Sequence, residues 1–259
     1  RGKQSRVRGS QSSNFGGKSA GIVSNSYKIM IKAVLMDWNG VVIDDEQVQC
    51  EAYREVMKPY GIELSDEDYY SRMGMNDRVF VRSVFEAAGK DISEDEIDSV
   101  AGAKTARWRE SVQKSVPLFE GVENFIKKTS TELDLGIVSM AKREEIELVL
   151  SLTGLAPYFS VVLTADDIHT YKPDPTCYRE GFRQIDLARV AKGGLPMVHE
   201  DCLVIEDSPA GVKAGKAADL PVLGVANTVS ADELRAAGAD AVAKRLDDWM
   251  PESLRRVFN

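Results

Sequence analysis

Two apolar runs along the chain each stop at acidic residues, and they predict where buried strands end. The first run, residues 33–36, is followed by Asp37, and the second, residues 203–205, is followed by Glu206 and Asp207. A short apolar run bounded by polar residues is typical of a strand covered on both faces of a parallel sheet. Because the carboxyl ends of such strands meet at one edge of the sheet, we expect the three carboxylates to lie close together.

After residue 121 the pattern of apolar positions alternates between strand and helix. We expect strands at 32–38, 135–139, 160–165, 203–207 and 222–226, with a short one near Ala241, and helices at 142–153, 174–185, 209–218 and 248–257. Ser230 and Glu233 have the spacing of a capping box, which marks another helix start. Strands that alternate with helices predict an α/β fold with a parallel sheet covered on both faces.

The segment between residues 46 and 117 interrupts this alternation and reads as helical throughout. Apolar residues recur at helical spacing over 46–60 and over 79–88, and Ser93 with Glu96 has capping-box spacing. A further helix is expected through Trp108 toward Val112. We therefore expect an inserted all-helical subdomain at 46–117, with 30–45 and 118–259 forming the sheet domain.

Composition narrows the class of protein without identifying it. The 259 residues are 29% charged and 43% hydrophobic, with a formal net charge of −8, which disfavours a nucleic-acid backbone as partner. The three cysteines are scattered, as in a reduced, cytoplasmic protein, and no apolar stretch is long enough to cross a bilayer. We expect a cytoplasmic monomer or homodimer with no membrane or nucleic-acid partner.

Residues 1–29 differ in kind from the rest of the chain. They hold six basic residues, no acid and much Ser and Gly. This composition indicates a disordered leader, a tag or a targeting segment, of which organelle targeting is the less favoured reading because no amphipathic stripe is visible. We leave the segment out of the fold.

Four groups of polar residues follow predicted strands and would converge at one edge of the sheet. A carboxylate, a hydroxyl, an ammonium and an acid pair suit phosphoryl transfer, which depends on positioning and on neutralising phosphoryl oxygens. Mg²⁺ prefers carboxylate oxygens, so the acids predict a Mg²⁺ site. The four groups are Asp37 with Asn39, Ser139, Lys172 in Lys172-Pro173-Asp174-Pro175, and Glu206-Asp207.

The order and spacing of these groups resemble the haloacid dehalogenase superfamily, over about residues 30–259. The resemblance rests on four stretches of sequence: Asp37-Trp38-Asn39-Gly40, Val138-Ser139, the Lys-Pro-Asp-Pro motif and Glu206-Asp207-Ser208-Pro209. The chain resembles the helical-cap branch of β-phosphoglucomutase-like and phosphoglycolate phosphatase-like enzymes. The resemblance implies a Rossmann-like doubly wound catalytic core at 30–45 and 118–259, with 46–117 as an inserted all-helical cap. The resemblance implies that Asp37 is nucleophile and Mg²⁺ ligand. It also implies that Asn39 (through its backbone carbonyl), Glu206 and Asp207 bind the metal, and that Ser139, Met140 and Lys172 bind phosphate.

Asn39 departs from the pattern of the family's phosphatases and phosphomutases, which have an aspartic acid there as general acid and base. An amide has no titratable proton near neutral pH. Phosphonoacetaldehyde hydrolases resemble the chain at Asp37-Trp38, but Asp77 stands where they carry a cap lysine that forms a Schiff base. Asn39 is consistent with an engineered change, with a leaving group that needs no proton, or with a protein kept for binding.

We expect a Mg²⁺-dependent phosphatase that forms an aspartyl-phosphate from a small phosphorylated metabolite and is impaired by Asn39. A phosphomutase of the β-phosphoglucomutase type, or a catalytically silent metabolite-binding protein, is the alternative. Substrate contacts in the cap are assigned to Gly74, Asn76 and Arg78, and solvated surface residues are the competing interpretation for them.

Overall fold

The computed structural model describes residue 2, residues 30–72 and residues 75–258. The predicted leader, apart from residue 2, and Gly74 lie outside the described residues. None of the described helices is both long enough and apolar enough to span a membrane.

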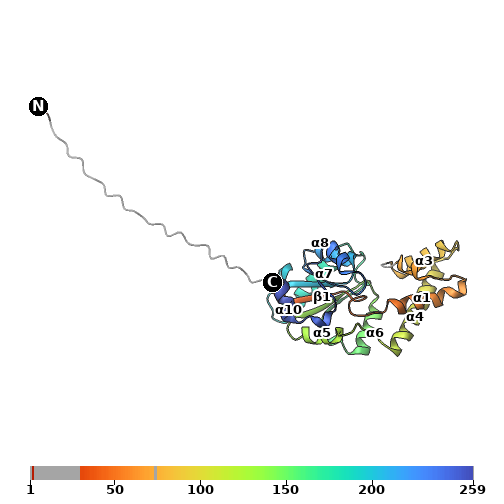
Figure 1. Cartoon of the computed structure of the whole chain (residues 1–259), viewed down its shortest axis with the longest axis horizontal. Helices are drawn as coiled ribbons and strands as arrows, with labels where there is room; N and C mark the ends of the chain where they lie inside the picture. Colours follow the sequence, from red (N-terminus) through yellow and green to blue (C-terminus); the bar gives the residue numbers. More distant parts are fainter. Residues whose placement is uncertain (1, 3–29, 73–74, 259) are drawn as a thin grey trace.

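A parallel sheet of six strands forms the centre of the larger lobe, as predicted (Figure 1). The strand order is β3-β2-β1-β4-β5-β6, and every neighbouring pair is parallel. The order reverses on either side of β1, which places the crevice of a doubly wound fold at the end of this strand. The strands are β1 (Ala33–Met36), β2 (Asp134–Val138), β3 (Phe159–Leu163), β4 (Cys202–Glu206), β5 (Val222–Val225) and β6 (Ala241–Ala243).

Successive side chains of each strand point to opposite faces of the sheet, and helices bury both faces. In β1, Val34 and Met36 belong to one hydrophobic cluster, and Ala33 and Leu35 belong to another. The first cluster is covered by α5 (Val122–Thr129), α6 (Arg143–Thr153) and α10 (Pro251–Phe258). The second is covered by α7 (Thr176–Ala191), α8 (Pro209–Ala217) and α9 (Ala231–Ala237). The sheet is thus the middle of three layers.

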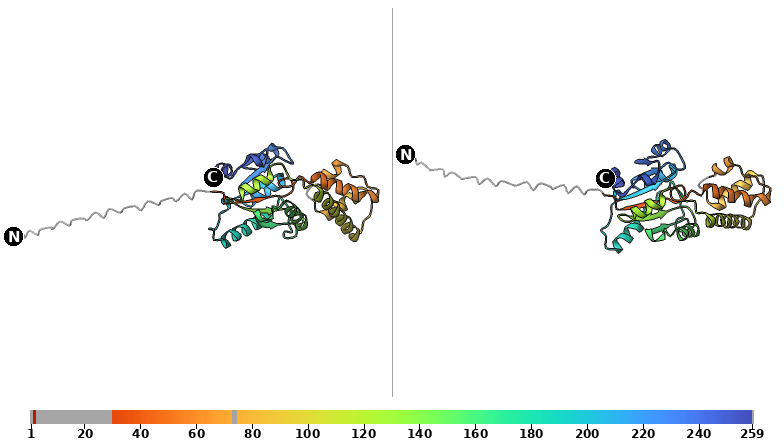
Figure 2. Two further views of the ribbon diagram at one scale, coloured as in Figure 1. Left: turned by 90° about the horizontal axis from the view of Figure 1, so that it is seen from below. Right: turned by 60° about the horizontal axis from the view of Figure 1, so that its bottom comes forward.

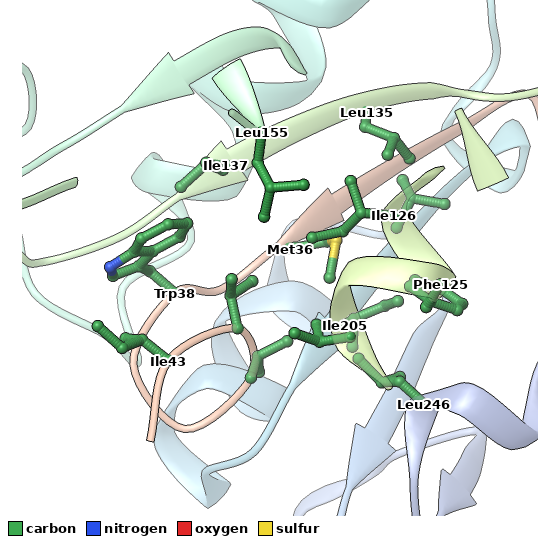
Figure 3. Close-up of a cluster of buried hydrophobic side chains, with 14 of the residues drawn as sticks. Met36, Trp38, Ile43, Phe125, Ile126, Leu135, Ile137, Leu155, Ile205 and Leu246 are labelled. Carbon is green, nitrogen blue, oxygen red and sulfur yellow. The ribbon is translucent and has the colours of Figure 1, made fainter. Parts of the chain in front are cut away.

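Trp38, which directly follows the predicted nucleophile, packs into the first of these clusters. Its side chain lies near Ile43 and Ile137 (Figure 3), and only 1% of it is exposed. The indole therefore anchors the loop after β1 in the apolar interior and does not line a pocket.

A second lobe is built from helices alone and lies beside the sheet domain (Figure 2). It contains α1 (Glu46–Met57), α2 (Asp66–Tyr70), α3 (Asp77–Ala87) and α4 (Glu94–Lys114), with a hydrophobic cluster of its own. Tyr53 and Phe80 stack in that cluster with ring centroids 4.0 Å apart. Two connections run antiparallel between the lobes, where Ile43 pairs with Leu118. The inserted lobe therefore lies beyond the carboxyl end of β1.

The observed elements differ from the predicted ones in a few places. Both capping boxes, at Ser93 and Ser230, are present. The helix expected through Trp108 is continuous with the one that starts after Ser93, so α4 runs for 21 residues. Helix α7 extends to Ala191, beyond the predicted end at 185, and α5 was not predicted. In the described part of the chain, short 3-10 helices lie at Lys58–Tyr60, Ala156–Tyr158, His199–Asp201 and Leu246–Asp248.

Candidate active site

The carboxylates of Asp37, Glu206 and Asp207 converge where β1 and β4 end. The two strands pair with Met36 opposite Ile205, and the N–H of Asp37 donates to the carbonyl of Ile205 at 3.0 Å. One carboxylate oxygen from each of the three acids lies within 4.8 Å of the others. The structure thus brings together acids that are about 170 residues apart in the chain.

Two glycines leave room for these acids. Gly40 has a φ of +76°, and a Cβ there would overlap the carboxylate of Asp207 and crowd the hydroxyl of Thr228. A Cβ at Gly211, in the first turns of α8, would overlap the carboxylate of Glu206. Gly40 is therefore required both by its backbone conformation and by the close approach of an acid.

Lys172, in the loop between β3 and α7, supplies a positive charge to this cluster. Its Nζ lies 2.9 Å from Oδ2 of Asp37 and 2.6 Å from Oε1 of Glu206, and only 9% of the side chain is exposed. Burial opposes the ammonium charge, but the two carboxylates outweigh it and raise the pKa of Lys172. The lysine is therefore charged and directed at the predicted nucleophile.

Two further side chains hold the acid pair, and sequence reasoning missed both. The hydroxyl of Tyr178, a fully buried residue of α7, donates to Oε1 of Glu206 at 2.6 Å. The hydroxyl of Thr228 donates to Oδ2 of Asp207. Tyr178 also lies beneath Lys172, with Nζ 5.2 Å from the ring centroid. No local sequence signal marks these contacts, because the partners are 28 and 21 residues apart.

Burial, followed by repulsion between the carboxylates, raises the pKa of Asp37 and of Asp207. Burial raises the pKa of Asp37 to about 8, Glu206 and Asp207 add to the rise, and Lys172 opposes it. Burial and Glu206 raise the pKa of Asp207 to about 7 against the hydrogen bond from Thr228. An added cation would reverse both shifts, because an opposite charge favours the ionised carboxylate.

These residues fit a divalent cation. When all three carboxyl groups are ionised, the ammonium of Lys172 leaves two net negative charges for a cation to balance, and the ligand atoms are all hard oxygens. Mg²⁺ takes such ligands and keeps part of its water shell. Glu206 already accepts hydrogen bonds at both oxygens, from Lys172 and Tyr178 at Oε1 and from Ser208 at Oε2. Asp37 is engaged at both oxygens as well, by the N–H of Trp38 and by Lys172. Asp207 accepts from a side chain at Oδ2 alone, so among the described acids it has the most freedom to bind the ion directly.

Ser139 and Met140 follow β2, the neighbour of β1 in the sheet. Ser139 is buried, its Oγ accepts from the N–H of Ala141 at 3.0 Å, and its N–H donates to the carbonyl of Leu163. Met140 is half-buried and packs against the second hydrophobic cluster. The structure places both at the edge where β1 ends, and among the described residues neither forms a hydrogen bond with Asp37.

The side chain of Asn39 is directed at the chain connection to the helical lobe. Its Nδ2 donates to Oδ1 of Asp45 at 2.8 Å. Asp45 is 1% exposed and burial raises its pKa, although three hydrogen bonds oppose the rise. The amide thus has a structural partner, which the sequence did not reveal.

The predicted cap residues fall in different surroundings. Asn76 caps α3 by accepting from the N–H of Val79, and its Nδ2 donates to the hydroxyl of Tyr171 on the core at 2.8 Å. Arg78 is held in a surface ion network with Asp98 and with Glu94. Asn76 therefore lies where the two lobes meet, whereas Arg78 is engaged on the surface of the helical lobe.

A largely buried group of charges, with Lys142 at its exposed edge, also joins the lobes. Lys142, at the start of α6, lies 2.6 Å from Asp77 at the start of α3, and Lys104 of α4 lies 3.2 Å from the same carboxylate. Glu145 of α6 faces Lys104 at 3.7 Å. Two positive and two negative charges thus balance at the interface between the lobes.

Comparison with known sequences gives one family. The family model described as haloacid dehalogenase-like hydrolase matches residues 34–225. A phosphorylated carbohydrates phosphatase from Thermotoga maritima is 30% identical over 231 residues, which is 88% of this chain and 98% of that protein. A validoxylamine A 7'-phosphate phosphatase from Streptomyces hygroscopicus subsp. limoneus is 26% identical over 228 residues, which is 85% of this chain and 96% of that protein.

Comparison with solved structures gives the same fold. The crystal structure of β-phosphoglucomutase from Clostridium difficile superposes with a TM-score of 0.72 at 21% identity, covering 89% of this chain and 98% of that one. At this identity the likeness shows the architecture alone: a Rossmann-like core with an inserted helical cap.

Proposed function

The chain belongs to the haloacid dehalogenase-like hydrolase family, and on that premise we propose that it is a Mg²⁺-dependent phosphatase acting on a small phosphorylated carbohydrate. Phosphatase-type hydrolysis agrees with the relatives that carry a functional name. The observation that carries the proposal is the convergence of Asp37, Glu206 and Asp207 with Lys172 at the end of β1.

Asp37 is the nucleophile in this proposal. One of its oxygens attacks phosphorus, the bond from phosphorus to the leaving oxygen breaks, and an aspartyl-phosphate forms on Asp37. Oδ1 accepts from the N–H of Trp38 at 2.8 Å, and Oδ2 faces Lys172, so the carboxylate is fixed in orientation. Fixing the attacking group in this way lowers the entropic part of the barrier.

The phosphoryl oxygens meet positive charge and hydrogen-bond donors. Lys172 offsets their negative charge, and the Ser139 hydroxyl and the backbone N–H of Met140 are assigned to bind them. Asp37, Asp207, Glu206 and the backbone carbonyl of Asn39 would hold Mg²⁺. When bound, the ion supplies electrostatic stabilisation of the transferring group.

Asn39 limits both halves of the reaction. Water must lose a proton as it attacks the aspartyl-phosphate, and the leaving oxygen must gain one in the first half. The amide does neither, and a positioned acid–base group contributes about 10²- to 10⁴-fold. We therefore assign slow turnover and a persistent aspartyl-phosphate to this chain.

The helical segment 46–117 is the cap in this proposal. It is joined to the core by two connections and meets it through Asn76–Tyr171 and Asp77–Lys142. Such an arrangement permits a hinge motion that shields the phosphoryl group from water. A carbohydrate substrate is supported by the names of the two phosphatase relatives.

A catalytically silent metabolite-binding protein is the second candidate, and Asn39 is the observation that favours it. A phosphomutase would use the same nucleophile and would transfer the phosphoryl group back to a sugar. It would need the same missing acid, so Asn39 disfavours the mutase and the phosphatase equally.

A substrate screen separates these candidates. Phosphate release from a panel of phosphorylated carbohydrates would be measured with and without Mg²⁺ for the parent chain, Asn39→Asp and Asp37→Ala. The phosphatase proposal expects slow Mg²⁺-dependent release by the parent and none by Asp37→Ala. Tight binding of a sugar phosphate with no release by either the parent or Asn39→Asp would support the silent protein.

A further inference from the structure

Asp45 is a buried carboxylate that forms three hydrogen bonds with side chains from three parts of the chain. Its Oδ1 accepts from Nδ2 of Asn39 at 2.8 Å, and its Oδ2 accepts from Nε2 of Gln49 at 2.9 Å and from Nε1 of Trp108 at 2.7 Å. Only 1% of the residue is exposed. A carboxylate so deeply buried is costly unless hydrogen bonds satisfy it.

The position of Asp45 in its helix makes these contacts unusual. Asp45 is the N-cap residue of α1, where an aspartate ordinarily accepts from the backbone N–H groups of the first turn. Here no side-chain capping bond is made. Its oxygens instead accept from the side chain of Gln49 in α1 itself and from two side chains outside that helix, and the usual stabilisation of the helix start is lost.

The three donors come from the two lobes. Asn39 lies in the loop that carries the predicted nucleophile, whereas Gln49 and Trp108 belong to α1 and α4 of the cap. Trp108 is 1% exposed, and it packs in the same hydrophobic cluster as Trp38. The carboxylate of Asp45 therefore connects the nucleophile loop to both long helices of the cap.

We propose that Asp45 is a positioning residue, which orients Asn39 and fixes the cap against the nucleophile loop, and that Asn39 is present because this carboxylate requires a donor. An acid at position 39 would then lower the stability of the folded chain. Asn39→Asp would place two carboxylate oxygens face to face, with no donor between them. The effect on turnover rests on the proposed function, but the effect on stability does not.

The geometry specifies a compensating substitution. Each oxygen of Asp45 has its own partners, with Asn39 at Oδ1 and the two cap side chains at Oδ2. In Asp45→Asn the amide oxygen can keep the bonds from Gln49 and Trp108, while the amide nitrogen faces position 39. The double variant Asn39→Asp with Asp45→Asn thus retains every hydrogen bond, with the direction of one reversed.

The test is thermal unfolding and phosphate release for the parent, both single variants and the double variant. We expect Asn39→Asp to lower Tm by several degrees and the double variant to return to within about 2 °C of the parent. Asp45→Asn alone should lower Tm by less than Asn39→Asp does, because the amide of Asn39 can turn its oxygen toward the new donor. In the double variant, turnover should exceed that of Asn39→Asp by about 10-fold or more, because the acid at 39 is then held in place.

Tyr69→Phe is the matched control, because it removes a hydrogen bond to Glu46, the residue that follows Asp45 in the chain. The Tyr69 hydroxyl donates to Glu46 at 2.5 Å, and among the described residues it forms no hydrogen bond with the loop that carries Asp37. Combined with Asn39→Asp, it should give no rescue. If Asn39→Asp is as stable and as active as the double variant, the proposal is wrong. Rescue of Tm without phosphate release by any variant would uphold the role of Asp45 and refute the phosphatase.

Discussion

The Nζ of Lys142 lies 2.6 Å from Oδ2 of Asp77, so an ion pair links the core helix α6 to the cap helix α3. Asp77 is only 16% exposed and also faces Lys104 at 3.2 Å. Burial alone would raise the pKa of Asp77, but the two lysines outweigh it and lower the pKa to about 2. The charge on Asp77 therefore stabilises the folded chain.

The sign of this shift predicts a loss of stability in acid. A carboxylate whose pKa is depressed to about 2 from 3.8 contributes about 2 kcal/mol above pH 4, and this is lost as the pH falls toward 2. The difference in unfolding free energy between the parent and Asp77→Asn should therefore shrink between pH 5 and about pH 2.5. Denaturant unfolding at several pH values measures it. Asp98 provides a control, because it pairs with Arg78 on the exposed surface, and Asp98→Asn should change the unfolding free energy little. A difference independent of pH would contradict the assignment.

Gly40 should tolerate no side chain. A Cβ would overlap the carboxylate of Asp207, and the φ of +76° is unfavourable for alanine. We expect Gly40→Ala to weaken Mg²⁺ binding by about 10-fold or more, as measured by calorimetry. Gly102, within α4, has nothing within 4 Å of its would-be Cβ, so Gly102→Ala should leave binding unchanged and add up to about 1 kcal/mol of stability. Equal effects of the two substitutions would contradict this prediction.

Tyr178 should matter to the site beyond its packing. Tyr178→Phe removes one of two donors to Oε1 of Glu206, so Glu206 and Lys172 lose their fixed positions. We expect about 10-fold weaker binding of Mg²⁺, and of vanadate as a phosphate analogue, together with a loss of about 1.5–3 kcal/mol in stability. Tyr69→Phe loses an equivalent bond to Glu46 in the cap and should lose stability without weaker binding. Unaltered ligand binding in Tyr178→Phe would show that its hydroxyl is only structural.

Mg²⁺ should stabilise the folded chain through Asp207. A ligand that binds only the folded state adds about 2.7 kcal/mol at a concentration of 100 times its Kd. Addition of MgCl₂ should raise Tm for the parent and not for Asp207→Asn, whereas KCl at matched ionic strength should raise neither. A comparable rise for Asp207→Asn would remove this residue from the metal site.

Local patterns allowed much of the fold to be predicted. The apolar runs that end at Asp37 and at Glu206 mark β1 and β4, and the spacing from Ser93 to Glu96 marks the start of α4. The sequence of α5 carries a comparable signal for a helix. Its buried residues Val122, Phe125, Ile126 and Thr129 recur at helical spacing.

The contacts that complete the site were not predictable in the same way. Trp108 donates to Asp45 across 63 residues, and Tyr178 donates to Glu206 across 28. Such pairs arise from the packing of whole elements, and no short motif encodes them. Asn39 therefore stands out in the sequence as a departure from a family pattern, whereas the structure gives it a partner in Asp45.

Detection of phosphate on Asp37 tests the central claim most directly. The parent chain would be incubated with Mg²⁺ and a reactive phosphoryl donor such as acetyl phosphate, then analysed by intact mass and peptide mass spectrometry after rapid acid quenching. Because Asn39 cannot activate water, we expect a mass increase of one phosphoryl group, located on the peptide that contains Asp37 and absent from Asp37→Ala. Chelation of Mg²⁺ should also abolish it. Equal phosphorylation of the parent and Asp37→Ala, or phosphate located on another residue, would contradict the account.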